Sequence, residues 1–495
     1  MKRFFYTGLL ILICKTTTWA QTGSDLYWTW MKGNKYATTI PHYGAKGIPA
    51  DENLPPARYA AATWTDAQGI FWLFGGSRSN SLMYNDLWNF NPVTRQWTWV
   101  AGDSIPNQYG DFGTQGQASP DNRPAARQHA MAWIDDRQHL WMFGGNYNYN
   151  GVEYGMYGDL WKFDLRIQQW IWVNGSRTNN ARPRLGSRTV PNPNNYPGAA
   201  YMASTWIDLQ GRCWMYGGGA YNETGTQPTW TNRLWMFDPV TEIWTWMKGD
   251  ARGFDTSFGI QQVPSASNCP GQRLMATTWT DVRGQLWLFG GELADGRKGN
   301  DLWKFDIRTN NWIWMKGSVP PPLINDYWPA QYGVRDLPAS ANNPGSRQGA
   351  AGGTNGNDKL FLFGGLGTIT EHNLGHLNDL WSYDIPTNTW TWLKGDSSIV
   401  APGDYGIFLQ PDINNAPPGR SMVAAWKDLS GNNWLFGGES YLADVWRLSG
   451  TGFTDSTTVR LSGRAFGDDL VVGAVEVEDR DLHLADLAPG PLHPR

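Results

Sequence analysis

The feature that most constrains the fold of this chain is a sequence unit that recurs six times with a nearly constant period. Its marker is a Gly-Gly pair after an apolar run, as in "LWLFGG" at 286–291. The first glycines of successive pairs lie 69, 73, 73, 74 and 73 residues apart. They are Gly75, Gly144, Gly217, Gly290, Gly364 and Gly437. Repetition at a fixed period indicates an array of similar supersecondary units, such as a solenoid or a propeller.

Each unit has the pattern of four short antiparallel strands. The first runs to a turn such as "WTDVRG" at 279–284, whose Asp and Gly favour a hairpin, and the second ends at the Gly-Gly pair. The third reads "NDLWKFD" at 300–306, and the fourth has its Trp nine residues beyond the Trp of the third. These strands are apolar on both faces, so each sheet needs a neighbour on both sides. Sheets packed face to face around an axis form a propeller.

The sixth unit lacks a fourth strand, and the start of the chain supplies one. No Trp lies nine residues beyond Trp446, whereas "LYWTWMKG" at 26–33 repeats the fourth-strand sequence. Trp28 precedes Arg58 by 30 residues, the spacing found at the equivalent positions of three other units. We therefore predict an all-β, six-bladed β-propeller of four-stranded antiparallel blades. The N-terminal strand completes the last blade, which leaves no broken edge at the seam.

The phrases "LWLFGG" at 286–291 and "NDLWKFD" at 300–306, followed by Trp312, resemble the kelch-repeat family. The resemblance covers residues 24–450 and extends to exported, bacterial-type kelch proteins of the galactose-oxidase-like propeller superfamily. The period of the present units exceeds the ~50 residues usual for kelch repeats, so each unit carries an insertion. The resemblance implies a propeller that most often serves as an interaction module and less often as an enzyme.

The two ends of the chain differ from the repeats. Residues 1–20 begin with Met1-Lys2-Arg3, continue with an apolar stretch and end at Ala20, which is the pattern of a secretory signal peptide. We expect the propeller over residues 21–450. Residues 451–495 are unassigned, and the alternatives are a disordered tail, the start of another module or a shifted reading frame. The predicted location is secreted: periplasmic, cell-surface or extracellular. No segment is apolar for long enough to predict a transmembrane span.

A repeated arginine and a repeated aspartate suggest a structural ion pair. Five units have Arg seventeen residues before the Gly-Gly pair and Asp at the start of the third strand, and the third unit has Ala200 and Arg233 there. Glycine has no side chain, so an arginine can cross it to reach the aspartate two strands away. The joint loss in one unit favours pairing over an anion-binding arginine ring. The predicted pairs are Arg58–Asp86, Arg127–Asp159, Arg273–Asp301, Arg347–Asp379 and Arg420–Asp444.

The loops between the second and third strands vary most, and with the insertions they share one face. Variable loops on a rigid scaffold often carry function. In three of them, aromatic, amide and imidazole groups could stack on a sugar ring or hold a peptide, or they could pack the loops against one another. The candidate ligand-binding residues are Tyr147, Tyr149, Tyr154, Tyr157, Tyr221, Trp230, His372 and His376. The insertions share an aromatic-Gly phrase, read as "YG" at 109 in the second unit, which we interpret as packing.

No catalytic motif was found, and neither a cofactor nor a metal is predicted. Cys213 and Cys269, the cysteines beyond the signal, match no copper radical oxidase pattern of linked Tyr and Cys with two His. The net charge of −4 and the absence of a basic block argue against nucleic acid. The leading hypothesis is an exported binding module for a protein or a glycan. The alternatives are a propeller enzyme acting on sugars as hydrolase, oxidase or isomerase at the channel mouth, and a structural surface component.

Overall fold

A computed structural model describes residues 26–450, apart from residues 37–39, 80, 150, 225–227, 252–255, 320–326, 371–372 and 440. The predicted signal peptide and the C-terminal segment 451–495 lie outside these residues. The described residues belong to one unit of the chain, Met1–Asp455, and Ser456–Arg495 form a second unit.

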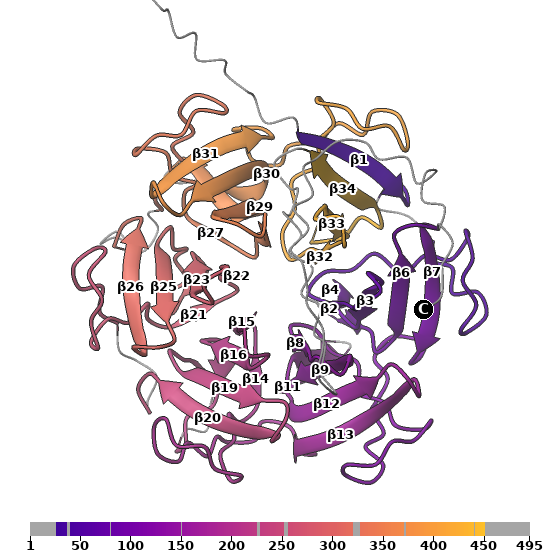
Figure 1. Cartoon of the computed structure of the whole chain (residues 1–495). Helices are drawn as coiled ribbons and strands as arrows, with labels where there is room; N and C mark the ends of the chain where they lie inside the picture. Colours follow the sequence, from indigo (N-terminus) through magenta and orange to yellow (C-terminus); the bar gives the residue numbers. More distant parts are fainter. Residues whose placement is uncertain are drawn as a thin grey trace, which may run out of the picture. The chain divides into compact units, whose positions relative to one another are not determined.

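The described residues fold into strands, and six antiparallel sheets of four principal strands stand around a central axis (Figure 1). The first three blades are β2 Ala62–Thr65, β3 Phe71–Phe74, β6 Leu87–Asn91 and β7 Gln96–Ala101; β8 Met131–Ile134, β9 His139–Phe143, β12 Gly158–Asp164 and β13 Gln169–Ser176; β15 Ser204–Ile207, β16 Cys213–Tyr216, β19 Leu234–Asp238 and β20 Ile243–Lys248. The last three are β22 Thr277–Thr280, β23 Leu286–Phe289, β25 Leu302–Asp306 and β26 Asn311–Lys316; β28 Ala351–Thr354, β29 Lys359–Thr370, β30 Asn373–Asp384 and β31 Thr389–Lys394; β32 Ala424–Lys427, β33 Asn433–Phe436, β34 Val445–Gly450 and β1 Leu26–Lys32.

The inner strands form a closed ring. In the order β2, β8, β15, β22, β28 and β32, each contacts the next, and β32 contacts β2. Aromatic rings fill the space between blades; for example, Phe71 of blade one stacks on Trp426 of blade six at 5.3 Å between ring centroids. The Trp426 indole N–H also donates to the carbonyl of Trp72 in blade one, at 3.1 Å. Because both faces of these sheets are covered, the second strands of blades one to four are buried along their whole length.

Strand β1 completes blade six, as predicted. It pairs antiparallel with β34, with Trp28 opposite Leu448. The Trp28 side chain is 1% exposed and packs against Phe363 of blade five, 5.1 Å away between ring centroids. The first described strand of the chain and the last one thus belong to the same sheet, which closes the ring.

Each predicted insertion lies along the outer strand of the blade that follows it. It thereby covers the edge of that blade. The Asn53 side-chain amide donates to the carbonyls of Trp97 in β7 and Ile48, both at 2.9 Å. Equivalent asparagines do the same in the other blades: Asn122, Asn195, Asn268, Asn342 and Asn415. An outer strand would otherwise offer a row of unpaired backbone groups to other chains. The sequence analysis did not identify this repeated asparagine clamp.

A ring of six backbone hydrogen bonds surrounds the channel on the side of the arginines. Each bond joins two residues from neighbouring blades. In each blade the residue lies two positions after the repeat arginine, or after Ala200 in blade three. The ring runs from Ala60 through Met422, Gly349, Met275, Met202 and His129 back to Ala60, with N–O distances of 2.8–3.2 Å. All six residues have φ between 51° and 61°. This left-handed conformation is rare for residues with a side chain, and it separates the arginine segment from the inner strand.

Shorter strands extend the sheets on the side of the long loops. They are β4 Ser77–Ser79 and β5 Leu82–Met83; β10 Asn146–Tyr149 and β11 Glu153–Met156; β14 Ala200–Tyr201, β17 Gly219–Ala220 and β18 Thr229–Trp230; β21 Arg273–Leu274 and β24 Glu292–Leu293; and β27 Arg347–Gln348. The repeat arginines therefore precede the inner strands. Two of them, Arg273 and Arg347, lie in the short strands β21 and β27. We predicted that the inner strand begins near the arginine, and it begins four residues later.

Candidate functional site

The five repeat arginines lie beside the five aspartates with which the sequence analysis pairs them. The closest N–O distances are 2.6 Å for Arg58–Asp86 and Arg127–Asp159, 2.7 Å for Arg347–Asp379 and 2.8 Å for Arg273–Asp301 and Arg420–Asp444; every one of these side chains is at most 1% exposed. Each guanidinium also donates to the carbonyl of the first glycine of its Gly-Gly pair. These arginine heads are buried against carboxylates, so they do not form an open anion site at the channel mouth.

The aspartates accept further hydrogen bonds from aromatic residues. The Trp two positions after each aspartate donates its indole N–H to the same carboxylate, as Trp381 does to Asp379 at 2.7 Å. In three blades a tyrosine hydroxyl from the insertion donates as well: Tyr43 to Asp86, Tyr332 to Asp379 and Tyr405 to Asp444, at 2.7–3.0 Å. Burial raises the pKa of these three tyrosines, and the neighbouring aspartate raises it further. The tyrosines therefore remain neutral donors.

One prediction about the insertions was wrong. In the second unit the packing aromatic is Phe112, which lies fifteen residues before Arg127 like its counterparts, and not Tyr109. Phe112 contacts Trp161 and Trp172 at 5.2 Å between ring centroids, whereas Tyr109 is 66% exposed. Blade four has Phe258 in the same place, with the same two contacts. The fifteen-residue spacing to Arg127 marks Phe112 in the sequence, and its two tryptophan contacts come from β12 and β13 of its own blade.

Blade three keeps an arginine without the carboxylate partner. Arg233 is 2% exposed, and its guanidinium donates to the carbonyls of Tyr221 and Ala251. Its Nε atom has no hydrogen-bond partner among the described residues. Burial lowers the pKa of this arginine, although Glu223 and Asp250 oppose the shift. Backbone carbonyls therefore serve as the acceptors for this arginine, where the arginines of the other blades have a carboxylate.

Three of the predicted ligand-binding tyrosines are buried in one cluster. Tyr147, Tyr149 and Tyr157 are 8%, 4% and 8% exposed and pack with Met83 of blade one. The Tyr149 hydroxyl bonds the Tyr157 hydroxyl at 2.9 Å and donates to the carbonyl of Ala126 at 2.8 Å. The structure thus corresponds to the packing alternative for these three residues. They hold the hairpin of β10 and β11 against blade one.

The other predicted ligand-binding residues are dispersed. Tyr154 is 51% exposed on β11, while Tyr221 and Trp230 are half-buried in the blade three loop. His376 is half-buried on β30, and its Nδ1 atom lacks a hydrogen-bond partner among the described residues. His372 lies outside the described residues.

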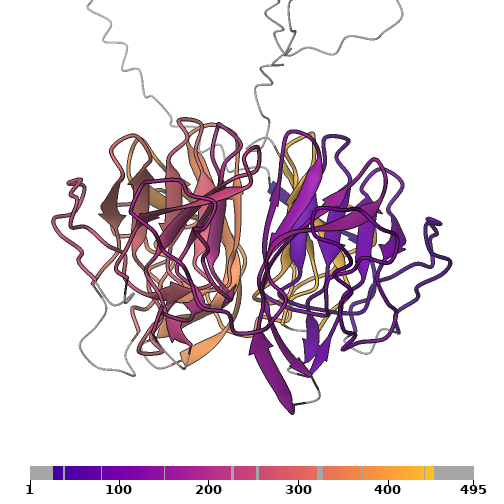
Figure 2. The same ribbon diagram turned by 90° about the horizontal axis from the view of Figure 1, so that it is seen from below.

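The hairpin of β10 and β11 presents exposed apolar and aromatic groups. Figure 2 shows it extending from one face of the propeller. Val152 in its turn is 85% exposed, and Tyr154 follows on β11. Tyr109, from the preceding insertion, donates its hydroxyl to Glu153 at 3.0 Å and so braces the hairpin. This surface, made of Tyr109, Val152 and Tyr154, is called the hairpin patch below.

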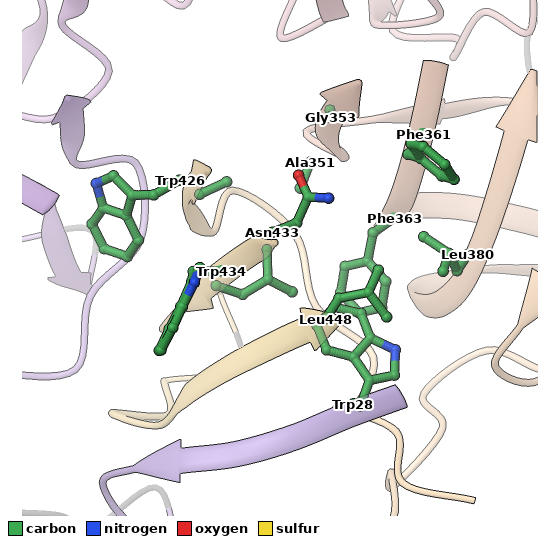
Figure 3. A pocket seen from close by; sticks show the side chains of 13 residues that line it. Trp28, Ala351, Gly353, Phe361, Phe363, Leu380, Trp426, Asn433, Trp434 and Leu448 are labelled. Atoms are coloured by element: carbon green, nitrogen blue, oxygen red, sulfur yellow. The ribbon is translucent and has the colours of Figure 1, made fainter. Parts of the chain in front are cut away.

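The channel is lined by hydroxyl groups and opens into a cavity between blades five and six. Its lining includes Thr63, Thr65, Thr278, Thr280, Thr354 and Lys427. Five inner strands carry a Trp whose indole wedges between blades, but blade five has Gly353 there. The resulting cavity is bordered by Phe361, Phe363, Trp426, Trp434 and Asn433 (Figure 3). Asn433 replaces an apolar residue of the other blades, and its Nδ2 atom has no hydrogen-bond partner among the described residues.

Other chemistry is sparse in the described part of the chain. No group of three or more His, Cys, Asp or Glu residues there could hold a metal ion. Neither Cys213 nor Cys269 forms a disulfide with another described residue. Within the same residues, no helix is long and apolar enough to cross a membrane.

Comparisons with known proteins agree with the fold. A family model, the KLHDC2/KLHL20/DRC7 Kelch-repeats domain, matches residues 21–250. A Kelch repeat-containing protein of Arthroderma benhamiae is 22% identical over 358 residues, which are 68% of this chain and 49% of that protein. Host cell factor 1 of Rattus norvegicus is 24% identical over 391 residues, 74% of this chain and 15% of its own length. The chain thus spans half or less of these relatives. With the six repeats and the propeller fold, these matches support a kelch-repeat propeller.

Proposed function

We propose that this protein is an interaction module that binds a protein partner through the hairpin patch. The observation that carries the proposal is the combination of exposure and rigidity at this hairpin. Val152 in the turn and Tyr154 on β11 are 85% and 51% exposed, yet the hairpin that carries them is held by the buried tyrosine cluster. A rigid aromatic and apolar group loses little entropy when it is covered, which favours its use as an interface anchor.

The similarity to kelch-repeat proteins supports this proposal. Kelch propellers resembling this one serve mostly as interaction modules, and a relative of this chain is called a host cell factor. No group of three or more His, Cys, Asp or Glu among the described residues could hold a metal ion. The comparisons give no support to a glycan partner, so the proposal commits to a protein.

The test replaces the tyrosine of position 154 by a photo-crosslinking phenylalanine derivative and identifies the captured protein by mass spectrometry. Binding of the purified partner is then measured for Val152→Asp and Tyr154→Ala. We expect each change to weaken binding by about tenfold or more, as for interface anchors. The matched control is Val240→Asp, in the turn between β19 and β20 at the opposite end of the blade strands, where the residue is 71% exposed. Equal losses at positions 154 and 240 would contradict a specific patch, and binding to a glycan array by the unmodified protein would favour a sugar instead.

We also propose that the protein is exported after removal of residues 1–20. The support is the basic start, the short apolar stretch and the small residue at Ala20. Mass spectrometry of the protein from a secreting host should find Gln21 as the first residue. A mature protein that keeps Met1 and stays inside the cell would refute export.

A further inference from the structure

The six residues of the backbone ring lie at the mouth of the channel. Residues joined by one N–H···O=C bond between neighbouring segments have Cα atoms about 5 Å apart. In a closed ring of six, each Cα atom then lies about the same distance, ~5 Å, from the axis. Because all six residues share one backbone conformation, their side chains leave the ring in the same way.

Four of these residues carry soft metal ligands. They are His129, Met202, Met275 and Met422, and the remaining positions are Ala60 and Gly349, which carry no donor. All four are half-buried, so solvent and small ions can reach them. A thioether two methylene groups from Cα spans most of the distance to the axis, so the three sulfur atoms and the imidazole are within reach of a common point.

One contact in the ring has the geometry of two ligands on one metal ion. His129 Nε2 lies 3.4 Å from the sulfur of Met422, across the small side chain of Ala60. Two ligands bound tetrahedrally at about 2.0 Å for nitrogen and 2.3 Å for sulfur are separated by about 3.5 Å. His129 and Met422 come from blades two and six, so only the closed propeller brings them together.

The hydrogen bond at Nδ1 of His129 explains why the contact between its Nε2 atom and the Met422 sulfur needs a cation. His129 Nδ1 lies 3.1 Å from Oδ1 of Asn146, an oxygen that can only accept a hydrogen bond. Nδ1 therefore carries the proton, and the Nε2 lone pair faces the lone pairs of the thioether. Neither atom can donate to the other. A partner that orients a histidine through its second nitrogen is the usual outer-shell arrangement of metal sites.

From this geometry we propose that the ring binds one Cu(I) ion through His129, Met202, Met275 and Met422. Thioether and imidazole ligands favour Cu(I) and its analogue Ag(I), whereas Ca²⁺ and Mg²⁺ require oxygen ligands. The site is separate from the hairpin patch and does not depend on the proposed interaction function. The site contains one histidine and neither cysteine nor carboxylate, because three of its four ligands are methionines.

The experiment titrates the purified protein with Cu(I) under anaerobic conditions in competition with a chromogenic Cu(I) chelator. We expect one equivalent to bind, and X-ray absorption at the copper edge should show one nitrogen and three sulfur neighbours. The triple variant Met202→Leu, Met275→Leu and Met422→Leu should bind Cu(I) at least about 100-fold more weakly, since it lacks three of the four ligands. The Asn146→Ala variant should weaken binding by about tenfold or more through the histidine.

The matched control replaces three half-buried methionines away from the ring, in the variant Met236→Leu, Met247→Leu and Met315→Leu. Leucine conserves the volume of methionine, so both triple variants should keep the melting profile of the parent protein. Equal Cu(I) affinity in the two triple variants would overturn the proposal, and so would the absence of competition by the parent protein. If the ring variant loses its fold, the Asn146→Ala titration and the absorption spectrum of the parent protein still decide the question.

Discussion

At the scale of single residues, the buried arginine–aspartate pairs are the most stringent feature of the blades. Arg273 and Asp301 are at most 1% exposed, and two guanidinium nitrogens meet the two carboxylate oxygens. Removal of either partner leaves an uncompensated buried charge, so Arg273→Ala should lower the free energy of unfolding by about 3–5 kcal/mol. The Asp301→Ala change should cost a similar amount, and the double variant should cost much less than the sum. Chemical denaturation measures all three; strictly additive losses would show that the two residues do not act as a pair.

The tyrosines on the aspartates offer a second residue-scale prediction. Tyr332 packs on Trp381 and Trp392 and donates to Asp379 at 3.0 Å, whereas Phe258 makes the same ring contacts in blade four without a hydroxyl. Tyr332→Phe should therefore cost about 1.5 kcal/mol, the contribution of a hydrogen bond to a charged group. The reverse change, Phe258→Tyr, is the matched variant and should gain stability if its hydroxyl reaches Asp301. Urea unfolding midpoints compare the two, and no effect from Tyr332→Phe would mean that the hydrogen bond is energetically neutral.

At the scale of whole elements, β1 provides the fourth strand of blade six. Its Leu26, Trp28 and Met31 side chains are 1%, 1% and 6% exposed. Deletion of residues 21–33 should cost at least about 5 kcal/mol, because each of these buried side chains contributes about 1.5–3 kcal/mol. Deletion of residues 456–495, which retains every described strand, is the control. Differential scanning calorimetry compares the two truncations, and equal melting temperatures would be incompatible with this role of β1.

The cavity beside the inner strand of blade five leads to a prediction of increased stability, in contrast to the losses predicted above. Gly353 occupies the place of the inter-blade Trp, and a Cβ atom there would lie 2.5 Å from Oδ1 of Asn433 (Figure 3). Gly353→Trp by itself should therefore destabilise the protein. Combined with Asn433→Leu it restores the residues of the other blades, and the double variant should gain about 1–3 kcal/mol from buried apolar surface. Thermal unfolding of the single and double variants checks this; a double variant less stable than the parent would show that the cavity cannot accept an indole.

At the scale of the whole molecule, the ring of backbone hydrogen bonds predicts uniform protection around the channel. The amide groups of Ala60, His129, Met202, Met275, Gly349 and Met422 are at half-buried positions, yet each one donates to a neighbouring blade. They should exchange with solvent far more slowly than the amide of Val240 in an exposed turn, and with similar rates, since opening one bond requires two blades to separate. Hydrogen exchange measured by mass spectrometry tests this. Fast exchange at two or more ring positions would indicate that the propeller opens as separate blades.

The propeller could be predicted from the sequence because its determining signals are repeated. Apolar alternation, Gly-Gly pairs and paired Trp residues act within a blade or between adjacent blades, so six copies reinforce one interpretation. The pairing of Arg58 with Asp86 was predictable for a similar reason. The two positions change together in blade three, and only a side chain crossing a glycine can join them. The strand missing from blade six pointed in the same way to β1.

The candidate site depended on the tertiary structure. Tyr147, Tyr149 and Tyr154 belong to one loop phrase, but blade one covers the first two and leaves the third exposed, a difference that the phrase does not contain. The ring at the channel mouth has Met at three of its six positions and Ala, His and Gly at the others, so no residue common to all six repeats marks it. Sequence by itself therefore determined the repeats, the blades, their closure and the buried ion pairs, because these arise from local patterns that recur. Only the closed propeller decided which side chains meet at the axis and which remain at the surface, because contacts such as His129 with Met422 join residues 293 positions apart that no local pattern relates.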